Sequence, residues 1–406
     1  MTRDEARARD AADPLRRFRD RFALPPDTIY LDGNSLGALP ADTPARIAAA
    51  VAGEWGAGLI RSWNDAGWID APTRIGAKIA PLIGAAPHEV LAADSTSVNL
   101  FKLLAAALDA RPGRRVILSE PGNFPTDLYV AEGVAAMRGA ELRTVAREDL
   151  VGAIDESVAV VMLTHVHYKS AAMFDMGAVT RAAHDAGALM LWDLSHSAGA
   201  VPVDLRAAGA DLAVGCGYKY LNGGPGAPAF LFVAERHLGT LRSPLSGWMG
   251  HQQPFAFDDG YAPCGTIRRF LCGTPPILGL AALEAGLDLF AEVDLEALWA
   301  KGRALTELFI RMVDAGAPEF TLVSPRDPGR RGSHVSFTHP DGYAITQALI
   351  ARGVIGDFRA PDVLRFGFTP LYLGFEDVWR AAEVLREVMA TGAWREERYA
   401  RRGVVT

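Results

Sequence analysis

Between about residue 88 and residue 235, short apolar runs alternate with segments of helical periodicity. The run 158–164 is apolar almost throughout, as a strand buried on both faces should be. This alternation predicts βαβ units with right-handed crossovers, and therefore an α/β fold around a mostly parallel sheet. Such sheets bind ligands beyond the carboxyl ends of their strands. The polar residues that follow each apolar run are thus the first candidates for a functional site.

The two ends of the chain have other patterns. Residues 1–23 predict one charged amphipathic helix, which Pro25 and Pro26 end. After about residue 275, two long helical segments precede several short strands, which indicates a smaller α+β domain. We therefore expect three parts: an N-terminal segment, 1-50, that packs with the small domain, a large domain, 51-274, and the small C-terminal domain, 275-406.

Composition excludes several classes of protein. Half of the 406 residues are apolar, so a sizeable core is available. The net charge of -7 has no basic cluster within it, which argues against nucleic acid or an anionic membrane as partner. The sequence contains no stretch of about 18 apolar residues, so we expect no membrane span. The three cysteines form no disulfide framework, which favours a reducing, cytoplasmic location.

One lysine, Lys219, lies in a glycine-rich stretch, 215–226, between two apolar runs. The runs predict buried strands joined by a tight turn. A lysine at the end of a buried strand tends to have a lowered pKa, which suits Schiff-base chemistry. The alternative is a hairpin whose lysine points to water, and this stretch alone does not decide between them. We expect the glycines to let the backbone approach a phosphate or a second subunit.

Asp193 ends the apolar run that precedes the lysine stretch by one crossover. A carboxylate and an amine at adjacent strand ends match the needs of pyridoxal phosphate, whose ring nitrogen the carboxylate keeps protonated. Thr96 and Ser97, at a helix start, could bind the phosphate or simply cap the helix. Phe124 is placed to stack on the ring.

Two further features have competing interpretations. Arg365, at the end of a small-domain strand, could bind a substrate carboxylate, although a surface position is the default for an arginine. Trp63 belongs to a group of tryptophans that predicts an aromatic wall, an interface or ordinary core packing. His165 and His167 have no third ligand at suitable spacing, so we expect no metal site.

Taken together, the motifs resemble those of the kynureninases, pyridoxal-phosphate enzymes of fold type I with the aspartate aminotransferase architecture. The resemblance spans the whole chain, and its motifs occur in the expected order. They are Tyr30-Leu31-Asp32-Gly33-Asn34-Ser35-Leu36-Gly37, Ser97-Val98-Asn99-Leu100, Phe124-Pro125-Thr126-Asp127, Trp192-Asp193-Leu194-Ser195-His196-Ser197-Ala198-Gly199, Gly217-Tyr218-Lys219-Tyr220-Leu221-Asn222-Gly223-Gly224-Pro225-Gly226, Gly247-Trp248-Met249-Gly250-His251 and Pro275-Pro276. The tyrosines on either side of the lysine make the resemblance more selective than the fold.

The resemblance implies a role for each matched residue. Lys219 would carry the cofactor and move the substrate's α-proton, and Tyr218 would act as acid or base at the γ-carbon. Arg365 and Asn34 would hold the substrate carboxylate, with Trp63 against the aromatic end. The implied cofactor-binding residues are Thr96, Ser97, Phe124, Asp127, Thr164, Asp193, His196, Tyr218 and Lys219, together with Trp248 and Thr274 from a second subunit.

The implied activity is hydrolytic cleavage of the Cβ–Cγ bond of L-kynurenine to anthranilate and L-alanine, a step of tryptophan breakdown and NAD synthesis. The implied assembly is a homodimer with its active site at the subunit interface. The rival interpretations are a small-amino-acid aminotransferase and a cysteine desulfurase-like lyase of the same fold. A desulfurase needs a nucleophilic cysteine on a small-domain loop, and 323–333 contains none.

Overall fold

The computed structural model describes residues 1–257 and 259–403. The chain divides into two compact units. The large unit comprises Pro44–His165 and Phe174–Asp288, and the small unit comprises Met1–Thr43, Val166–Met173 and Leu289–Thr406. These divisions fall after residues 43 and 288, whereas the sequence suggested 50 and 274. The segment Val166–Met173, which begins two residues after the end of β5 (Val158–Thr164), also belongs to the small unit.

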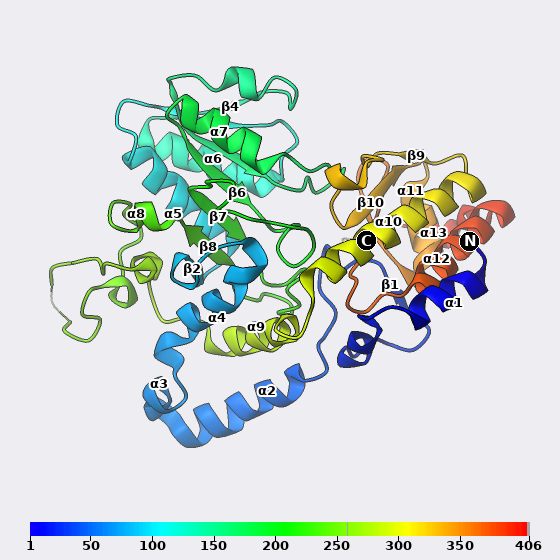
Figure 1. Cartoon of the computed structure of the whole chain (residues 1–406), viewed down its shortest axis with the longest axis horizontal. Helices are drawn as coiled ribbons and strands as arrows, with labels where there is room; N and C mark the ends of the chain where they lie inside the picture. The colour runs from blue at the N-terminus through cyan, green and yellow to red at the C-terminus, as the bar shows by residue number, and fades with distance from the viewer. Residues whose placement is uncertain (258, 404–406) are drawn as a thin grey trace. The chain divides into compact units, whose positions relative to one another are not determined.

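A seven-stranded sheet with the order β2-β8-β7-β6-β5-β3-β4 forms the centre of the large unit (Figure 1). Neighbours from β7 to β4 pair in parallel, while β8 is antiparallel to both β7 and β2. The predicted mostly parallel sheet is therefore confirmed. Its strands are β2 (Val90–Ala92), β3 (Val116–Ser119), β4 (Glu141–Thr144), β5, β6 (Leu189–Asp193), β7 (Leu212–Gly215) and β8 (Phe230–Val233).

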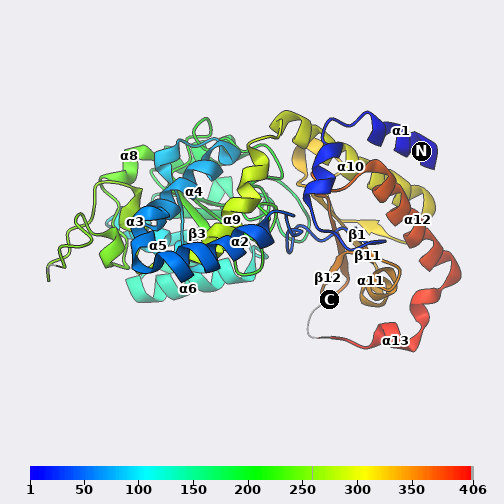
Figure 2. The ribbon, with the colours of Figure 1, turned by 90° about the horizontal axis from the view of Figure 1, so that it is seen from below.

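Helices of the large unit follow the strands in sequence, and α5 and α6 pack side by side (Figures 1 and 2). Every residue of β5 is buried, because β-branched and other apolar side chains fill both faces of a central strand. The helices are α2 (Thr43–Ala49), α3 (Ser62–Asp65), α4 (Ala71–Ile79), α5 (Thr96–Asp109), α6 (Pro125–Arg138), α7 (Met176–Asp185), α8 (Glu235–Leu238) and α9 (Ile277–Phe290).

The small unit contains an antiparallel sheet with the order β12-β13-β10-β9. A cluster of phenylalanines fills its core, with Phe309 and Phe366 ring centroids 4.8 Å apart. The elements are α1 (Arg3–Ala11), β1 (Ile29–Tyr30), α10 (Leu295–Gly316), β9 (Thr321–Leu322), β10 (His334–Thr338), α11 (Gly342–Ile350), β11 (Val354–Ile355), β12 (Asp357–Arg359), β13 (Val363–Gly367), α12 (Phe375–Thr391) and α13 (Glu397–Ala400).

The N-terminal segment belongs to the small unit, where β1 pairs with β11 and α1 packs on α12. The prediction of one helix over residues 1–23 is wrong, because α1 ends at Ala11 and a separate 3-10 helix covers Arg16–Arg21. Pro14 lacks the N–H that a continuous helix needs, and Asp13 instead accepts a hydrogen bond from the amide of Leu15.

Among residues 1–257 and 259–403, no helix combines the length and the apolar character that crossing a bilayer would require.

Candidate active site

Lys219 lies in the connection between β7 and β8, and its side chain does not point to water, since the residue is only 9% exposed. Its Nζ is 3.3 Å from His196 Nε2 and 5.8 Å from the centroid of the Phe124 ring. The two bounding strands pair in antiparallel register from Leu212–Val233 to Gly215–Phe230. The segment that follows β7 therefore places a buried amine beside an imidazole and an aromatic ring.

The glycines around Lys219 serve close packing within the chain. A Cβ on Gly217 would lie 2.3 Å from the carbonyl oxygen of Pro228, and one on Gly223 would lie 2.7 Å from the carbonyl oxygen of Gly217. The amide of Gly223 also donates to that oxygen at 2.9 Å. At these two positions the absence of a Cβ lets the chain's own backbone approach closely, and the approach of the glycine-rich stretch to a phosphate or a second subunit stays a prediction.

Asp193 and Thr164 occupy neighbouring positions where β6 and β5 end, because the register pairs Thr164 with Asp193 and Asp193 with Val214. Asp193 is buried, and its Oδ1 accepts hydrogen bonds from the amide of Ser195 at 2.8 Å and from the Ser195 hydroxyl at 2.6 Å. The parallel sheet thus places this carboxylate one strand away from the segment that carries Lys219.

A second carboxyl group, that of Asp127 in the first turn of α6, is completely buried beside Asp193. Burial, the charge of Asp193 and a hydrogen bond with Asp193 together raise the pKa of Asp127 well above its ordinary value. This environment therefore favours the protonated form of Asp127. Its Oδ2 has no hydrogen-bond partner within the described part of the chain.

Neighbouring polar side chains hold this pair in place. The hydroxyl of Thr164 donates to Asn123 Oδ1, which also accepts a hydrogen bond from the amide of Phe124 at 2.8 Å. This network fixes the start of α6, and hence the position of the Phe124 ring. Sequence analysis missed Asn123, although it stands immediately before the matched motif at 124–127.

At the start of α5, one residue caps the helix, and other residues are available to bind a ligand. Helix α5 begins at Thr96, and its N-cap is Ser95, whose side chain accepts a hydrogen bond from the amide of Val98 at 3.3 Å. The half-buried hydroxyls of Thr96 and Ser97 are therefore not needed as caps. Together with the amides of a helix N-terminus, they form a site that suits a phosphate.

Tyr218 is half-buried next to Lys219, and its ring centroid lies 5.8 Å from the lysine Nζ. Burial, followed by the effects of Cys216 and Asp193, raises the pKa of Tyr218 above its ordinary value. In this structure the phenol is thus a proton donor at neutral pH, whereas a tyrosine acting as a base would need a lowered pKa.

The large unit also gathers aromatic rings. Trp63 packs edge-on against Trp68 and Trp248, with ring centroids 6.0 and 6.3 Å away. Trp248 in turn contacts Phe255 at 5.5 Å between centroids. Thr274 is exposed. Trp63 and Trp248, which the sequence placed in different roles, therefore share one aromatic cluster within the same chain.

In the small unit, Arg365 is 2% exposed, which excludes the surface position. Its Nε donates to Asp357 Oδ1 at 2.8 Å, its Nη1 to the carbonyl of Tyr168 at 2.6 Å, and its Nη2 to Ser35 Oγ at 3.1 Å. Cross-strand pairing of β12 with β13 places Asp357 opposite Arg365. The sequence predicted the arginine but missed both Ser35 and Asp357.

Asn34 is also in the small unit and is fully buried. It packs against Gly367, where a Cβ would fall 1.9 Å from Asn34 Oδ1. Asn34 is therefore held beside the strand that carries Arg365, one residue before Ser35, which makes the direct contact with the guanidinium.

The two histidines considered as metal ligands have local partners. His165 Nδ1 lies 2.9 Å from Ser197 Oγ, and burial lowers the pKa of His165 to about 4. His167 Nδ1 accepts a hydrogen bond from the amide of Ser170 at 3.2 Å. The His165 ring thus contacts the segment after β6, and the His167 ring contacts its own loop.

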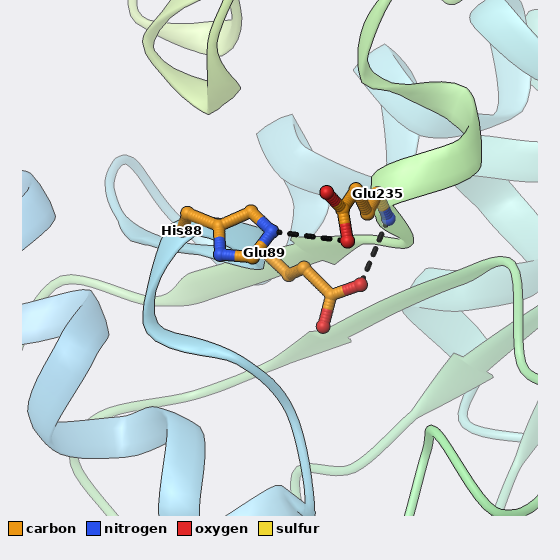
Figure 3. A group of neighbouring side chains, drawn as sticks. All are labelled: His88, Glu89 and Glu235. Atoms are coloured by element: carbon orange, nitrogen blue, oxygen red, sulfur yellow. Dashed lines mark hydrogen bonds and ion pairs between the residues drawn. The ribbon is translucent and has the colours of Figure 1, made fainter.

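Within residues 1–257 and 259–403, one group of three potential metal ligands has its atoms within 4.8 Å of one another: His88, Glu89 and Glu235 (Figure 3). The two oxygens of Glu89 already accept hydrogen bonds from the amides of Ala86 and Glu235, at 2.9 and 2.8 Å. His88 Nε2 is 3.5 Å from a carboxylate oxygen of the exposed Glu235. The buried Glu89 thus accepts hydrogen bonds from two backbone amides, next to a surface pair formed by His88 and Glu235.

Comparison with solved structures supports the fold. The chain matches a cysteine desulfurase from Thermococcus onnurineus NA1 with a TM-score of 0.79 and 20% identity, over 93% of this chain and 98% of that one. It also matches a mutant of C-DES that has glycine covalently linked to its PLP cofactor, with a TM-score of 0.77 and 18% identity, over 90% and 98%. The predicted fold class is confirmed.

Comparison with curated proteins gives much closer relatives. The chain is 56% identical over 415 residues to a kynureninase of Burkholderia mallei (strain SAVP1), and 54% identical over 414 residues to a kynureninase of Pseudomonas fluorescens. Both alignments cover the whole of each protein. Residues 298–385 match the family model of the kynureninase C-terminal domain. The chain therefore belongs to the kynureninase family.

Proposed function

We propose that this protein hydrolyses L-kynurenine to anthranilate and L-alanine with pyridoxal 5'-phosphate as its cofactor. The observation that carries the proposal is the buried Lys219, which lies beside His196 at the carboxyl ends of the parallel strands. The 56% identity to a kynureninase over the full length supports the choice of reaction.

The residues present fit this cofactor. Lys219 would bind it covalently, Phe124 would lie against its ring, and Asp193 would pair with its ring nitrogen. A protonated ring nitrogen would also offset the burial of the Asp193 carboxylate, and the neighbouring Asp127 has an oxygen, Oδ2, without a hydrogen-bond partner in the described chain. When bound, the group supplies an electron sink for the carbanions of this reaction.

The phosphate would lie at the N-terminus of α5, where the hydroxyls of Thr96 and Ser97 are not occupied by capping. His196 and Tyr218 would border it. We assign Trp248 and Thr274 to further phosphate contacts supplied by a second subunit, as the family resemblance implies.

Two side chains of this protein would move protons. Lys219 would take the α-proton of the substrate and return a proton to the alanine product. Tyr218 would donate a hydrogen bond or a proton at the γ-carbonyl while water adds there, because burial keeps its phenol protonated. Breaking the Cβ–Cγ bond then releases anthranilate, with the hydroxyl from water retained in its carboxyl group.

The substrate would be oriented from its two ends. Arg365, aided by Asn34, would bind the carboxylate, and Trp63 would contact the aromatic amine. The hydrogen bonds of Arg365 to Asp357, Ser35 and the Tyr168 carbonyl fix the position of its guanidinium, which would attract the substrate carboxylate chiefly by its charge.

We further propose that the active unit is a homodimer. Trp55, Leu59 and Ile60 each expose more than half of their surface on the segment between α2 and α3, at the edge of the large unit (Figure 1). Phe255 and Phe257 are similarly exposed next to Trp248. Exposed apolar groups of this size favour a protein partner, and a second copy fits because the site is expected to need Trp248 and Thr274 from it.

We place the protein in the cytoplasm, in tryptophan breakdown or NAD synthesis. The cysteines Cys216, Cys264 and Cys272 are all free thiols, which suits a reducing compartment.

Product analysis tests the proposed reaction. The purified protein with pyridoxal phosphate should convert L-kynurenine to fluorescent anthranilate and an equal amount of L-alanine. Formation of a keto acid without anthranilate would instead identify an aminotransferase. Release of sulfur from L-cysteine would identify a desulfurase, although no cysteine lies in the 323–333 loop.

A further inference from the structure

Asp32 is an unusual group in the small unit. It lies two residues after the end of β1, and its backbone forms a parallel bridge to Gly367, at the end of the strand that carries Arg365. Its Oδ1 is buried and has no hydrogen-bond partner within the part of the chain that the structure describes. A buried carboxylate oxygen without a partner is costly, whereas a protonated carboxyl group is much less so.

Asp32 lies in a cluster of charged and titratable side chains. The charged and titratable groups that face Asp32 are Asp357 and Arg359 on β12, Arg365 on β13, and Tyr30 on β1. Asp357 Oδ2 is 2.7 Å from Arg359 Nη2 and also contacts Arg365. With Tyr30 neutral, two arginines face two carboxyl groups, and the cluster is neutral when both carboxyl groups are ionised.

The two carboxyl groups have different environments. Burial alone would raise the pKa of Asp357, but the hydrogen bonds and charges of Arg365 and Arg359 lower it below its ordinary value. Burial, followed by the charge of Asp357, raises the pKa of Asp32 to about 7. Any proton that this coupled pair takes up near neutral pH therefore resides mainly on Asp32.

A substrate carboxylate beside Arg365 would be the third negative group near two arginines. Its charge would repel an ionised Asp32, and a proton on Asp32 would remove that repulsion. We propose that Asp32 is a positioning residue that takes up a proton from solvent when the carboxylate of the substrate binds beside Arg365, which makes substrate affinity depend on pH. This inference rests on the proposed function, because it assumes that Arg365 binds the substrate carboxylate.

The sign of the pH dependence follows from linkage. Below pH 7, Asp32 is already protonated and binding should be insensitive to pH. Above pH 7, binding must draw a proton from solvent, so KM for kynurenine should rise by about tenfold per pH unit. The pH dependence should appear in KM and not in kcat. The reason is that Asp32 already carries the proton in the substrate complex, which determines kcat.

The first test compares the KM profile of the wild-type holoenzyme with that of Asp32→Asn between pH 6 and 8.5. The amide cannot ionise, so the rise above pH 7 should disappear in this variant. Asp20→Asn is the matched control: Asp20 is an exposed aspartate of the same unit, and its variant should keep the wild-type profile. An unchanged profile in Asp32→Asn would overturn the inference.

The second test measures proton uptake directly. Calorimetric titration of the holoenzyme with 3-phenylpropanoate, a carboxylate without an amine, in two buffers of different ionisation enthalpy gives the number of protons bound. At pH 7 we expect about half a proton for the wild type and close to none for Asp32→Asn. No uptake by the wild type would overturn the inference even if Asp32→Asn fails to fold, and Asp32→Ala provides a second variant.

The two proposals can fail separately. If the wild type forms no anthranilate from kynurenine, the proposed function is wrong. If anthranilate forms with a KM that is constant from pH 6 to 8.5, the function stands and the role of Asp32 is wrong.

Discussion

Two clusters of buried charges, one in each unit, use aspartate in opposite ways. In the large unit, Asp127 lies buried beside Asp193, and burial and the charge of Asp193 raise the pKa of Asp127 well above its ordinary value. In the small unit, Arg365 and Arg359 hold Asp357 in its ionised form. The side chain is the same in both places, so the neighbours alone decide its charge. The first cluster has Lys219 as its cationic neighbour, and the second, which contains two arginines, is suited to an anion.

The largest expected effect concerns the amine that the first cluster surrounds. Lys219→Ala should reduce anthranilate formation by at least about 10³-fold, because both the covalent link and the proton carrier are lost. The absorbance of the bound cofactor near ~420 nm should also disappear. Spectra and rates of the purified variant check this prediction. Wild-type activity in Lys219→Ala would remove Lys219 from the mechanism.

The next prediction separates the two carboxyl groups of the large unit. Asp193→Asn should lower kcat by about 10²-fold, because an amide cannot stabilise a protonated ring nitrogen. Asp127→Asn should lower kcat by less than about fivefold, because burial favours the neutral form of Asp127 and an amide has nearly the same shape. Steady-state kinetics of the two variants, at saturating cofactor, give the comparison. Equal losses would mean that the two groups do not differ in charge.

The smallest of these effects concerns the second cluster. Arg365→Lys keeps the charge but loses the planar set of donors that contacts Asp357, Ser35 and the Tyr168 carbonyl. KM for kynurenine should rise by about tenfold or more, with a smaller change in kcat. Arg359→Lys is the control, because Arg359 is partly exposed, contacts Asp357 and reaches Ser35 only at 3.5 Å, so its KM should change less. A larger KM effect in Arg359→Lys would transfer the role of carboxylate binding to Arg359.

Much of the large unit's site could be predicted from the sequence because its residues follow apolar runs directly. The end of β6 is Asp193, and Lys219 comes a few residues after β7, so recognising the strands was enough to bring the two side chains near one another. Thr164 was named only through the family resemblance, and the structure pairs it with Asp193 across β5 and β6. The residues that support these side chains, such as Asn123, were missed, because a hydrogen bond between two loops leaves no periodic pattern.

The small unit was less predictable. Arg365 was recognised, but its partners come from β12, from the 30–37 motif and from the loop that carries Tyr168, which are far apart in the sequence. The N-terminal helix was predicted too long, because the helical spacing of apolar residues outweighed the effect of Pro14.

The amino-acid sequence by itself determined the order of strands and helices, the lysine at the end of a buried strand and the family to which the motifs belong. Those properties depend on short-range patterns of apolar, glycine and polar residues. Only the tertiary structure decided which carboxyl groups are ionised. Asp127, Asp32 and Asp357 are the same residue type, and their pKa values are raised or lowered by burial and by charges brought from distant segments.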